Sequence, residues 1–435
     1  MNRKLTRQIC NEWRSNLWLI LELAIVSVAI YYLTDGLTST FRVEALPNGY
    51  ETTDVYNMPV YKLPKENDFY TYPSDSATRV DAMIQNFDAL LKSIESRPGV
   101  ESVAAGGNVQ VFTYNYWGAN MFAPDNRDSI IAMVNVREGT PELAEVLRLK
   151  PLAGADSPAE LRNVLERGEL IITRSAGRSM TEGVADNPMI DGLPGARLLL
   201  GKEVMLYGRR YTIGAVAEDT RRGYREAAHA GNAIRPISRR TTEPADGGDI
   251  LVRVAPGHGA ELEQDFKAHP EAYRAGEFYV PQCVSMENER AGMELDSRIE
   301  QRNKVIVMVF LLLTIFLGLL GTFWFRTANR TSEIAVRKSV GAGTSDIFRR
   351  LVGEGLLLLT IATIPALMAD YALARWNPEE TWVYYGYMFA GGPWLQLALS
   401  AGTVYVLMAL MTVAGIWLPA RRAMRTDPAA ALHAE

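Results

Sequence analysis

The sequence predicts a membrane protein with four transmembrane α-helices and a large extracytoplasmic α+β domain inserted between helices 1 and 2. Three observations predict this fold class. Four apolar runs are long enough to cross a bilayer, residues 34–304 contain no such run, and Lys and Arg cluster beside only some of the run ends. We expect three parts: residues 1–33 with the first helix, residues 34–304 as the inserted domain, and residues 305–435 as a domain with the other three helices.

The four runs are residues 17–33, 305–325, 351–369 and 394–418. A spanning helix needs roughly 20 apolar residues, and a helix in a soluble core is seldom apolar on every face over that length. Tryptophans stand at or near their ends, where an amphipathic ring prefers the headgroup layer: Trp18, Trp324, Trp394 and Trp417. The sequence therefore excludes a purely soluble enzyme.

The first run is short and contains Glu22, so a cleaved signal peptide is the alternative interpretation. The run ends in Tyr31 and Tyr32 without a small-x-small cleavage site. Three remaining spans would also leave the two termini on opposite sides. We therefore expect an uncleaved anchor.

Charge predicts which side each segment faces, because basic residues are retained in the cytoplasm. Lys and Arg stand before the first run, between the second and third, and after the fourth, whereas residues 370–393 carry Arg375 alone against three acidic residues. Both termini and residues 326–350 are therefore expected in the cytoplasm, and residues 34–304 outside. Residues 34–304 hold 40 acidic and 31 basic residues, and this excess of negative charge argues against binding of nucleic acid.

Residues 34–304 show mixed helical and alternating patterns between Gly, Pro and Asp turns. Helices are predicted over 82–96 and 141–148, and a hairpin turn at 207–210. Residues 218–249 are expected to form a long solvated loop, and 296–304 to continue as one helix into the second span. Strands are predicted over residues 109–114, 130–136, 170–173, 203–207, 210–216 and 250–254.

The connection between the second and third runs predicts a short amphipathic helix followed by a bend. Glu333 and Arg337 are four residues apart in the favourable order, and Ile334, Ala335, Val336 and Val340 supply an apolar side. Gly341 to Gly343 should end this helix, and Thr344 or Ser345 with Asp346 should start the next. Two interpretations stay open: the helix docks onto a soluble cytoplasmic partner, or it lies on anionic headgroups.

Few residues suggest chemistry. Cys10 and Cys283 are expected on opposite sides of the membrane as inert thiols, and the four histidines form no metal-ligand spacing. No nucleophile motif occurs, so a membrane-anchored enzyme is the weaker alternative. Glu22 and Glu354 fall inside spans near their cytoplasmic ends, where a structural partner is preferred over a proton relay.

The motif EIAVRKSVGAGTSDIFRRLVGEGLLL, residues 333–358, resembles the signature of FtsX-like permeases of ABC transporters, the MacB type in particular. The tail LPARRAMRTDPAAAL, residues 418–432, is similar to the closing motif of that family. Residues 140–154, 168–180 and 199–219 look like its extracytoplasmic domain. Two departures stand out: there is no GxxxxGK[ST] phosphate loop, and the third run contains Pro365.

The resemblance implies a permease subunit in a bacterial inner membrane that works with a separate ABC ATPase. The chain itself would bind no cofactor and catalyse nothing, ATP and Mg²⁺ belonging to the ATPase. A second permease subunit would complete a homodimer or heterodimer, and a periplasmic adaptor and an outer-membrane channel are further expected partners. The residues that contact the ATPase would be Glu333, Ile334, Arg337, Lys338, Gly341, Ala342 and Asp346.

The expected activity is export of a peptide, antibiotic or lipid-linked molecule by transmitted mechanical motion. The alternatives are a transmembrane regulator of a cell-wall hydrolase or sensor, and a lipoprotein-release permease. Fold analogy does not choose among them.

Overall fold

The computed structural model describes residues 13–44, 47–63, 76–113, 117–180, 193–221, 231–238, 248–376 and 392–425. The chain forms two compact units, one from residues 1–42 with 297–435 and the other from residues 43–296. Cys10, His229 and His433 lie outside the described residues.

The first unit is a bundle of long helices. In the described part of the chain, four helices are long and apolar enough to cross a membrane, which confirms the four predicted spans. A fifth, short helix connects two of them. The helices are α2 (Trp13–Glu44), α9 (Met286–Asn329), α10 (Thr331–Ser339), α11 (Thr344–Trp376) and α13 (Gly392–Met424).

Small residues let these helices approach closely, as in many membrane bundles. A Cβ atom at Gly355 of α11 would stand 2.3 Å from Ile416 of α13, and one at Gly415 would stand 3.0 Å from Leu319 of α9. Leu23 of α2, Phe323 of α9 and Leu358 of α11 are buried in the same apolar cluster. The bundle therefore packs around a continuous core.

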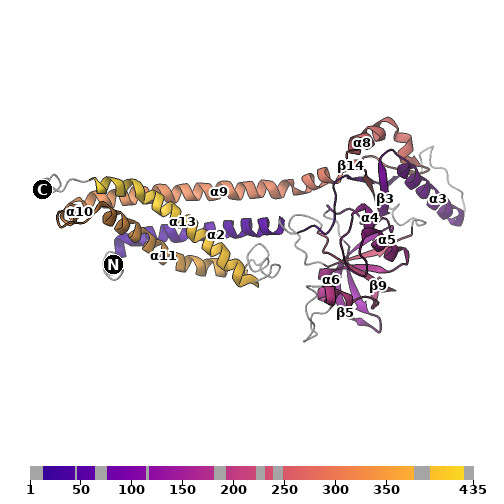
Figure 1. Cartoon of the computed structure of the whole chain (residues 1–435), viewed down its shortest axis with the longest axis horizontal. Coiled ribbons are helices and arrows are strands. Elements are labelled where there is room, and N and C mark those ends of the chain that lie inside the picture. Colours follow the sequence, from indigo (N-terminus) through magenta and orange to yellow (C-terminus); the bar gives the residue numbers. More distant parts are fainter. Residues whose placement is uncertain are drawn as a thin grey trace. The chain divides into compact units, whose positions relative to one another are not determined.

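Helix α9 is one unbroken helix of 44 residues, about 66 Å long at 1.5 Å per residue (Figure 1). Its first residues belong to the second unit, where Met286 is part of a buried cluster, and the rest belong to the bundle. The prediction that residues 296–304 continue into the second span as one helix is confirmed.

In its described residues, the second unit is an α+β domain with three sheets. The seven-stranded sheet has the order β6-β9-β7-β10-β5-β4-β8, and β8 also pairs with β9, so six of its strands form a closed ring. One buried cluster takes side chains from all six strands of that ring. Its strands are β6 (Pro151–Ala153), β9 (Arg209–Ala217), β7 (Leu170–Thr173), β10 (Gly231–Pro236), β5 (Asn126–Gly139), β4 (Trp117–Ala123) and β8 (Glu203–Leu206).

The other two sheets are smaller and antiparallel. Helices α3 and α8 bury apolar residues in one cluster with strands of both. The four-stranded sheet has the order β14 (Val284–Ser285), β1 (Val55–Pro59), β11 (Asp249–Val254) and β3 (Val100–Gly106), and the three-stranded sheet the order β12 (Arg274–Ala275), β13 (Phe278–Tyr279) and β2 (Tyr61–Lys62). The helices are α3 (Ser76–Glu95), α4 (Leu143–Val146), α5 (Pro158–Glu166), α6 (Arg174–Ser179), α7 (Leu193–Arg197), α8 (Gly259–Ala268) and the 3₁₀ helix η2 (Pro270–Tyr273).

The hairpin predicted at residues 207–210 joins β8 to β9, and Tyr207 and Gly208 both have positive φ, as a type I′ turn requires. The strand predicted over 109–114 is wrong for the described residues 109–113. Val109 turns inward beneath Gly106, where a Cβ would stand 2.5 Å from its Cγ1, and Asn108 Nδ2 donates to the Val136 carbonyl. These contacts turn residues 109–113 away from pairing with a neighbouring strand.

The long solvated loop predicted over residues 218–249 is also wrong in part. Strand β10 lies within it, parallel to β5 and antiparallel to β7. Ala233 and Ile234 are fully buried there, and the Asn232 backbone amide donates to Thr173 Oγ1, so this otherwise polar strand is fixed in the sheet.

Candidate functional site

The segment between the second and third spans forms a short helix with one buried and one exposed face. Ile334 and Ala335 of α10 are buried, whereas Val336 and Val340 are 49% and 82% exposed. The sequence pattern placed all four on one apolar side, and the structure corrects this. The inner pair attaches α10 to the bundle, and the outer pair leaves an apolar spot on its surface.

A tight turn ends α10 after Ser339. Gly341 has a φ of +96°, a conformation that residues with a Cβ seldom adopt. The Gly341 amide donates to the Lys338 carbonyl and the Ala342 amide to the Arg337 carbonyl, which is the Schellman pattern that closes helix C-termini. Ala342 is thus held in place by its backbone.

The next helix, α11, begins at Thr344. The Asp346 carboxylate accepts a hydrogen bond from the Gly343 amide at 3.1 Å, and its negative charge favours the positive end of the helix. Ile347, one residue later, is 5% exposed and packs into the bundle core. The two helices are therefore joined by a short, defined bend.

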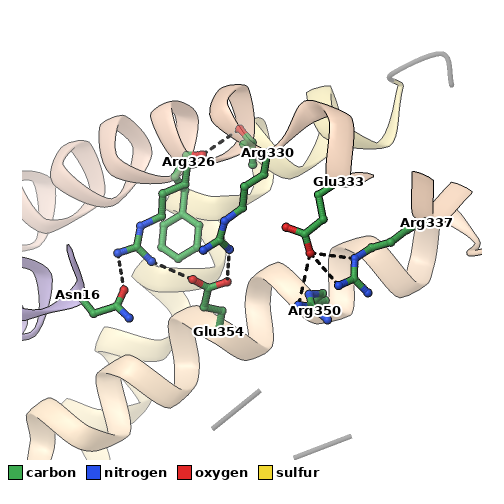
Figure 2. Close-up of polar contacts among 9 residues, drawn as sticks. Asn16, Arg326, Arg330, Glu333, Arg337, Arg350 and Glu354 are labelled. Atoms are coloured by element: carbon green, nitrogen blue, oxygen red, sulfur yellow. Dashed lines mark hydrogen bonds and ion pairs between the residues drawn. The ribbon is translucent and has the colours of Figure 1, made fainter. Parts of the chain in front are cut away.

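Glu333 of α10 forms ion pairs with two arginines. Arg337 Nη2 lies 2.7 Å and Arg350 Nη2 3.8 Å from its Oε1 atom, so it links α10 to α11 (Figure 2). Burial raises the pKa of Glu333, but the hydrogen bond from Arg337 and the charges of Arg337, Arg350 and Arg330 outweigh burial and leave that pKa below its usual value. Glu333 is therefore ionised at neutral pH.

Glu354 lies on α11 one helix turn after Arg350 and is 3% exposed. Its two oxygens pair with Arg326 Nη1 at 2.8 Å and Arg330 Nη1 at 3.3 Å, both near the end of α9. Arg326 Nη2 also donates to Asn16 Oδ1 of α2 at 2.5 Å (Figure 2). Arg326 of α9 thus links to α11 through Glu354 and to α2 through Asn16.

Lys338 faces a different helix from Glu333. Its Nζ atom donates to the backbone carbonyl of Met424, near the end of α13, at 2.5 Å. A basic side chain at this position also interacts favourably with the negative end of that helix. Helix α10 therefore contacts the bundle at two separate places.

Glu22 lies apart from this group, within the spanning part of α2. A Cβ at Gly318 of α9 would stand 2.3 Å from its Oε1 atom, so the glycine makes room for the carboxylate. Within the described residues Glu22 forms no ion pair. The sequence treated Glu22 and Glu354 alike, whereas the structure gives them different surroundings.

Asn16, Arg326, Arg330 and Arg350 belong to this group although the sequence does not predict them as site residues. In the sequence the arginines indicate only which side of the membrane the segment faces. Their spacing carried one signal, since Arg326 and Arg330 are four residues apart and therefore share a helix face.

A pocket of about 90 Å³ lies among the end of α9, α10 and the start of α11. Its lining combines charged and apolar side chains, Phe323 and Leu351 among the latter. Among the described residues no group of three or more His, Cys, Asp or Glu side chains could hold a metal ion.

Comparison with known proteins places this site in a family domain. Residues 305–428 match the model of the FtsX-like permease C-terminal domain. The macrolide export ATP-binding/permease protein MacB of Bordetella avium is 27% identical over 130 residues, which are 30% of this chain and 19% of that protein. MacB of Rhodopseudomonas palustris is 30% identical over 119 residues, 27% of this chain and 16% of that protein. The chain thus spans less than a fifth of these relatives' length.

Two solved structures are also similar. The periplasmic region of MacB from Actinobacillus actinomycetemcomitans has a TM-score of 0.30 and 12% identity, covering 58% of this chain and 98% of that one. The extracellular domain of the noncanonic ABC-type transporter YknZ from Gram-positive bacteria has a TM-score of 0.30 and 11% identity, covering 52% and 100%.

Proposed function

Because this chain belongs to the FtsX/MacB-type permeases of ABC transporters, we propose that it transmits mechanical motion from an ATPase on one side of the membrane to the α+β domain. The observation that carries the proposal is the structure of α10, a short helix attached to the bundle by Ile334 and Ala335 while Val336, Arg337 and Val340 stay exposed. Such a face suits docking of a soluble protein.

Contacts around α10 suit it to transmit force. Glu333 joins it to Arg350 of α11, Lys338 joins it to the end of α13, and Glu354 joins α11 to α9. A force applied to α10 would therefore be transmitted to α9, α11 and α13 and would not be absorbed by a flexible loop. Helix α9 continues without a break into residues of the α+β unit, and so offers a stiff path for that motion.

The chain is a multi-pass membrane protein, and we place it in the bacterial inner membrane. In the proposed orientation both termini and α10 face the cytoplasm, and the α+β domain lies outside. Basic residues support this orientation: Arg326, Arg330, Arg337, Lys338, Arg349 and Arg350 stand between the second and third spans.

The proposed partners follow from this placement. An ABC ATPase, carried on a separate chain, would bind ATP and Mg²⁺ and contact Glu333, Arg337, Lys338, Gly341, Ala342 and Asp346 together with the exposed Val336 and Val340. Ile334, expected among these contacts from the sequence, is buried and holds α10 to the bundle instead. A second permease subunit, identical or similar, would complete the complex. The proposed activity is export of a peptide, antibiotic or lipid-linked substrate, with a periplasmic adaptor and an outer-membrane channel. The similar MacB proteins carry macrolide export in their names.

The test is co-purification from mild detergent with a nonhydrolysable ATP analogue, with bound chains identified by mass spectrometry. We expect an ABC ATPase that is lost in the double variant Glu333→Ala, Arg337→Ala. The matched control is Glu300→Ala, Lys304→Ala, which removes another ion pair four residues apart, 2.8 Å long, on α9.

Absence of an ATPase from folded wild-type protein would contradict the coupling proposal. Recovery of a hydrolase or sensor kinase in place of an adaptor would contradict export and favour the regulatory alternative.

A further inference from the structure

The first turns of α9 lie against one face of the four-stranded sheet. Met286, the first residue of α9, is fully buried in one cluster with Val55 of β1 and Leu251 of β11. Strand β14, which α9 follows directly in the chain, pairs with β1 at Asn57. The place where α9 joins the α+β unit is therefore this face of β1 and β11.

Two polar side chains stand on the same face beside these apolar ones. Successive residues of a strand point to opposite faces, so Asn57 shares the face of Val55, and Asp249 shares the face of Leu251. Asn57 is 3% exposed, and its side-chain amide donates a hydrogen bond to the Asp249 carboxylate. Within the described residues, the Asn57 Oδ1 atom is buried and accepts no hydrogen bond. A buried amide oxygen is unfavourable unless a donor reaches it.

A proton on Asp249 would supply that donor. An ionised carboxylate only accepts hydrogen bonds, whereas a protonated carboxyl group also donates one. Protonated Asp249 would accept from the Asn57 amide and donate to Asn57 Oδ1. The two side chains would then form a closed pair with both hydrogen bonds made.

Glu289 of α9 gives a second reason for the proton. Burial, opposed by the hydrogen bond from Asn57 and assisted by the negative charge of Glu289, raises the pKa of Asp249 to about 6. Asp249 and Glu289 are each half-buried, and within the described residues neither forms an ion pair. Two carboxylates without a cation between them hold a proton more strongly than one alone.

The other charged residues of the elements packed around Asp249 are engaged elsewhere. On α9, Arg290 and Glu294 pair with each other at 2.7 Å, and Glu287 acts on Tyr56, which lies on the opposite face of β1 together with α3 and α8. The charged residues of β3, α4 and β11 interact at other places: Glu101 with Arg148, Glu145 with Arg162, and Arg253 with the backbone carbonyls of residues 51, 53 and 146. Among the described residues, Glu289 is therefore the charged group that acts on Asp249.

We propose that Asp249 and Asn57 form a proton-binding site that controls how firmly the first turns of α9 are held against the sheet. With the proton bound, the pair is closed and the repulsion between Asp249 and Glu289 is absent. Without the proton, Asn57 Oδ1 has no donor and two negative charges face each other at the contact. This site lies within the α+β unit, so it does not depend on the ATPase proposal.

The test is hydrogen exchange of the full chain in detergent, measured by mass spectrometry on peptides from residues 286–296 and corrected for the pH dependence of the intrinsic rate. Because the folded pKa lies above the ordinary value of 3.8, the contact is strongest below that pH and weakens as pH rises through about 6. We expect protection to fall about tenfold between about pH 4 and about pH 7.5. The shift in pKa from 3.8 to about 6 allows at most about a hundredfold.

Two variants separate the roles of the carboxylates. Asp249→Asn keeps the shape and both hydrogen bonds of the protonated pair, so it should stay protected and lose the pH dependence. Glu289→Gln should keep the dependence and shift its midpoint to lower pH, because one of the two negative charges is gone. The matched control is Glu287→Gln, which removes an exposed charge from the same helix turn and should leave the wild-type profile unchanged.

Protection of residues 286–296 that does not change over this pH range would overturn the proposal. So would either a wild-type pH dependence or a loss of protection at every pH in folded Asp249→Asn protein. Calcium or magnesium chloride at millimolar concentration should not restore protection at the upper pH. If either salt does, the carboxylates hold a metal cation in place of a proton and the assignment fails.

Discussion

Arg326 of α9 and Glu354 of α11 form an ion pair of 2.8 Å although 28 residues separate them, and their side chains are only 13% and 4% exposed. A carboxylate buried this deeply in a membrane bundle is unfavourable unless it is paired. The pair, extended by Arg330 and Asn16, therefore fixes how α2, α9 and α11 meet.

Glu354→Ala should destabilise the bundle by about 3–5 kcal/mol, because it leaves Arg326 and Arg330, whose side chains are only 13% and 22% exposed, without this carboxylate. Thermal unfolding in detergent measures the effect. The control is Glu300→Ala on α9, whose side chain is 40% exposed, so that loss of its pair with Lys304 should change stability by less than about 1 kcal/mol. Equal losses of stability in the two variants would show that burial of the Glu354 ion pairs does not add to the stability of the bundle. A Glu354→Gln variant that assembles normally yet loses transport would contradict a structural role.

Gly341→Ala should loosen the end of α10 by about 1 kcal/mol, because φ is positive there. No atom lies within 4 Å of the added Cβ, so the penalty is conformational and not steric. Hydrogen exchange of the α10 amides should rise about fivefold, which corresponds to that free energy. Gly343→Ala is the control, since its φ is not positive and its nearest neighbour stands 3.4 Å away. Similar exchange in both variants would contradict the assignment of strain to Gly341.

Asp265 of α8 is a carboxylate that three other side chains contact. It accepts hydrogen bonds from Arg97, Tyr273 and His269, and the hydrogen bond from Arg97 outweighs burial and lowers its pKa to about 2. Because the folded pKa is depressed, the stabilisation is present above the ordinary value of 3.8 and is lost as pH falls toward 2.

Asp265→Asn should therefore destabilise the protein by about 1.5–3 kcal/mol at pH 7. The difference from wild type should shrink below pH 4, as denaturation at a series of pH values would measure. Asp88→Asn is the control, because its pair with Lys92 is exposed. A difference that stays constant down to pH 3 would contradict the assigned charge.

Cys283 should resist alkylation in the folded protein. Burial, with a smaller effect from the charge of Glu263, raises its thiol pKa to about 12, so almost no thiolate exists at pH 8. Peptide mapping after treatment with iodoacetamide should find this cysteine unmodified in native protein and modified after denaturation. Rapid labelling of native protein would show a reactive thiol instead of the inert one expected from the sequence.

Local patterns predicted much of the fold because they act over short distances. Long apolar runs determine spanning helices, and the glycines at 341 and 343 do end α10 before α11 starts at Thr344. The ring of strands could not be predicted in the same way. Its parallel pairs, β7 with β9 and β10 with β5, join segments far apart in the sequence, and no local pattern encodes such pairing.

The site was predictable only in part for the same reason. The pair Glu333–Arg337 follows from a spacing of four residues, whereas the contact of Glu333 with Arg350 and those of Glu354 with Arg326 and Arg330 arise between helices. Packing against the bundle also determines that Val336 and Val340 point away from it. Ile334 and Ala335 fill the inner face of α10, which leaves Val336 and Val340 outside.

The central claim is that the exposed face of α10 contacts an ATPase. A photoreactive amino acid at position 340, where the valine is 82% exposed, tests it in living cells. The control position is Tyr207, which is 50% exposed in the turn between β8 and β9 of the α+β domain. We predict an ATPase adduct at position 340 and none at position 207. Adducts with lipid alone at position 340, in protein that remains folded, would contradict the account and return α10 to the headgroup interpretation.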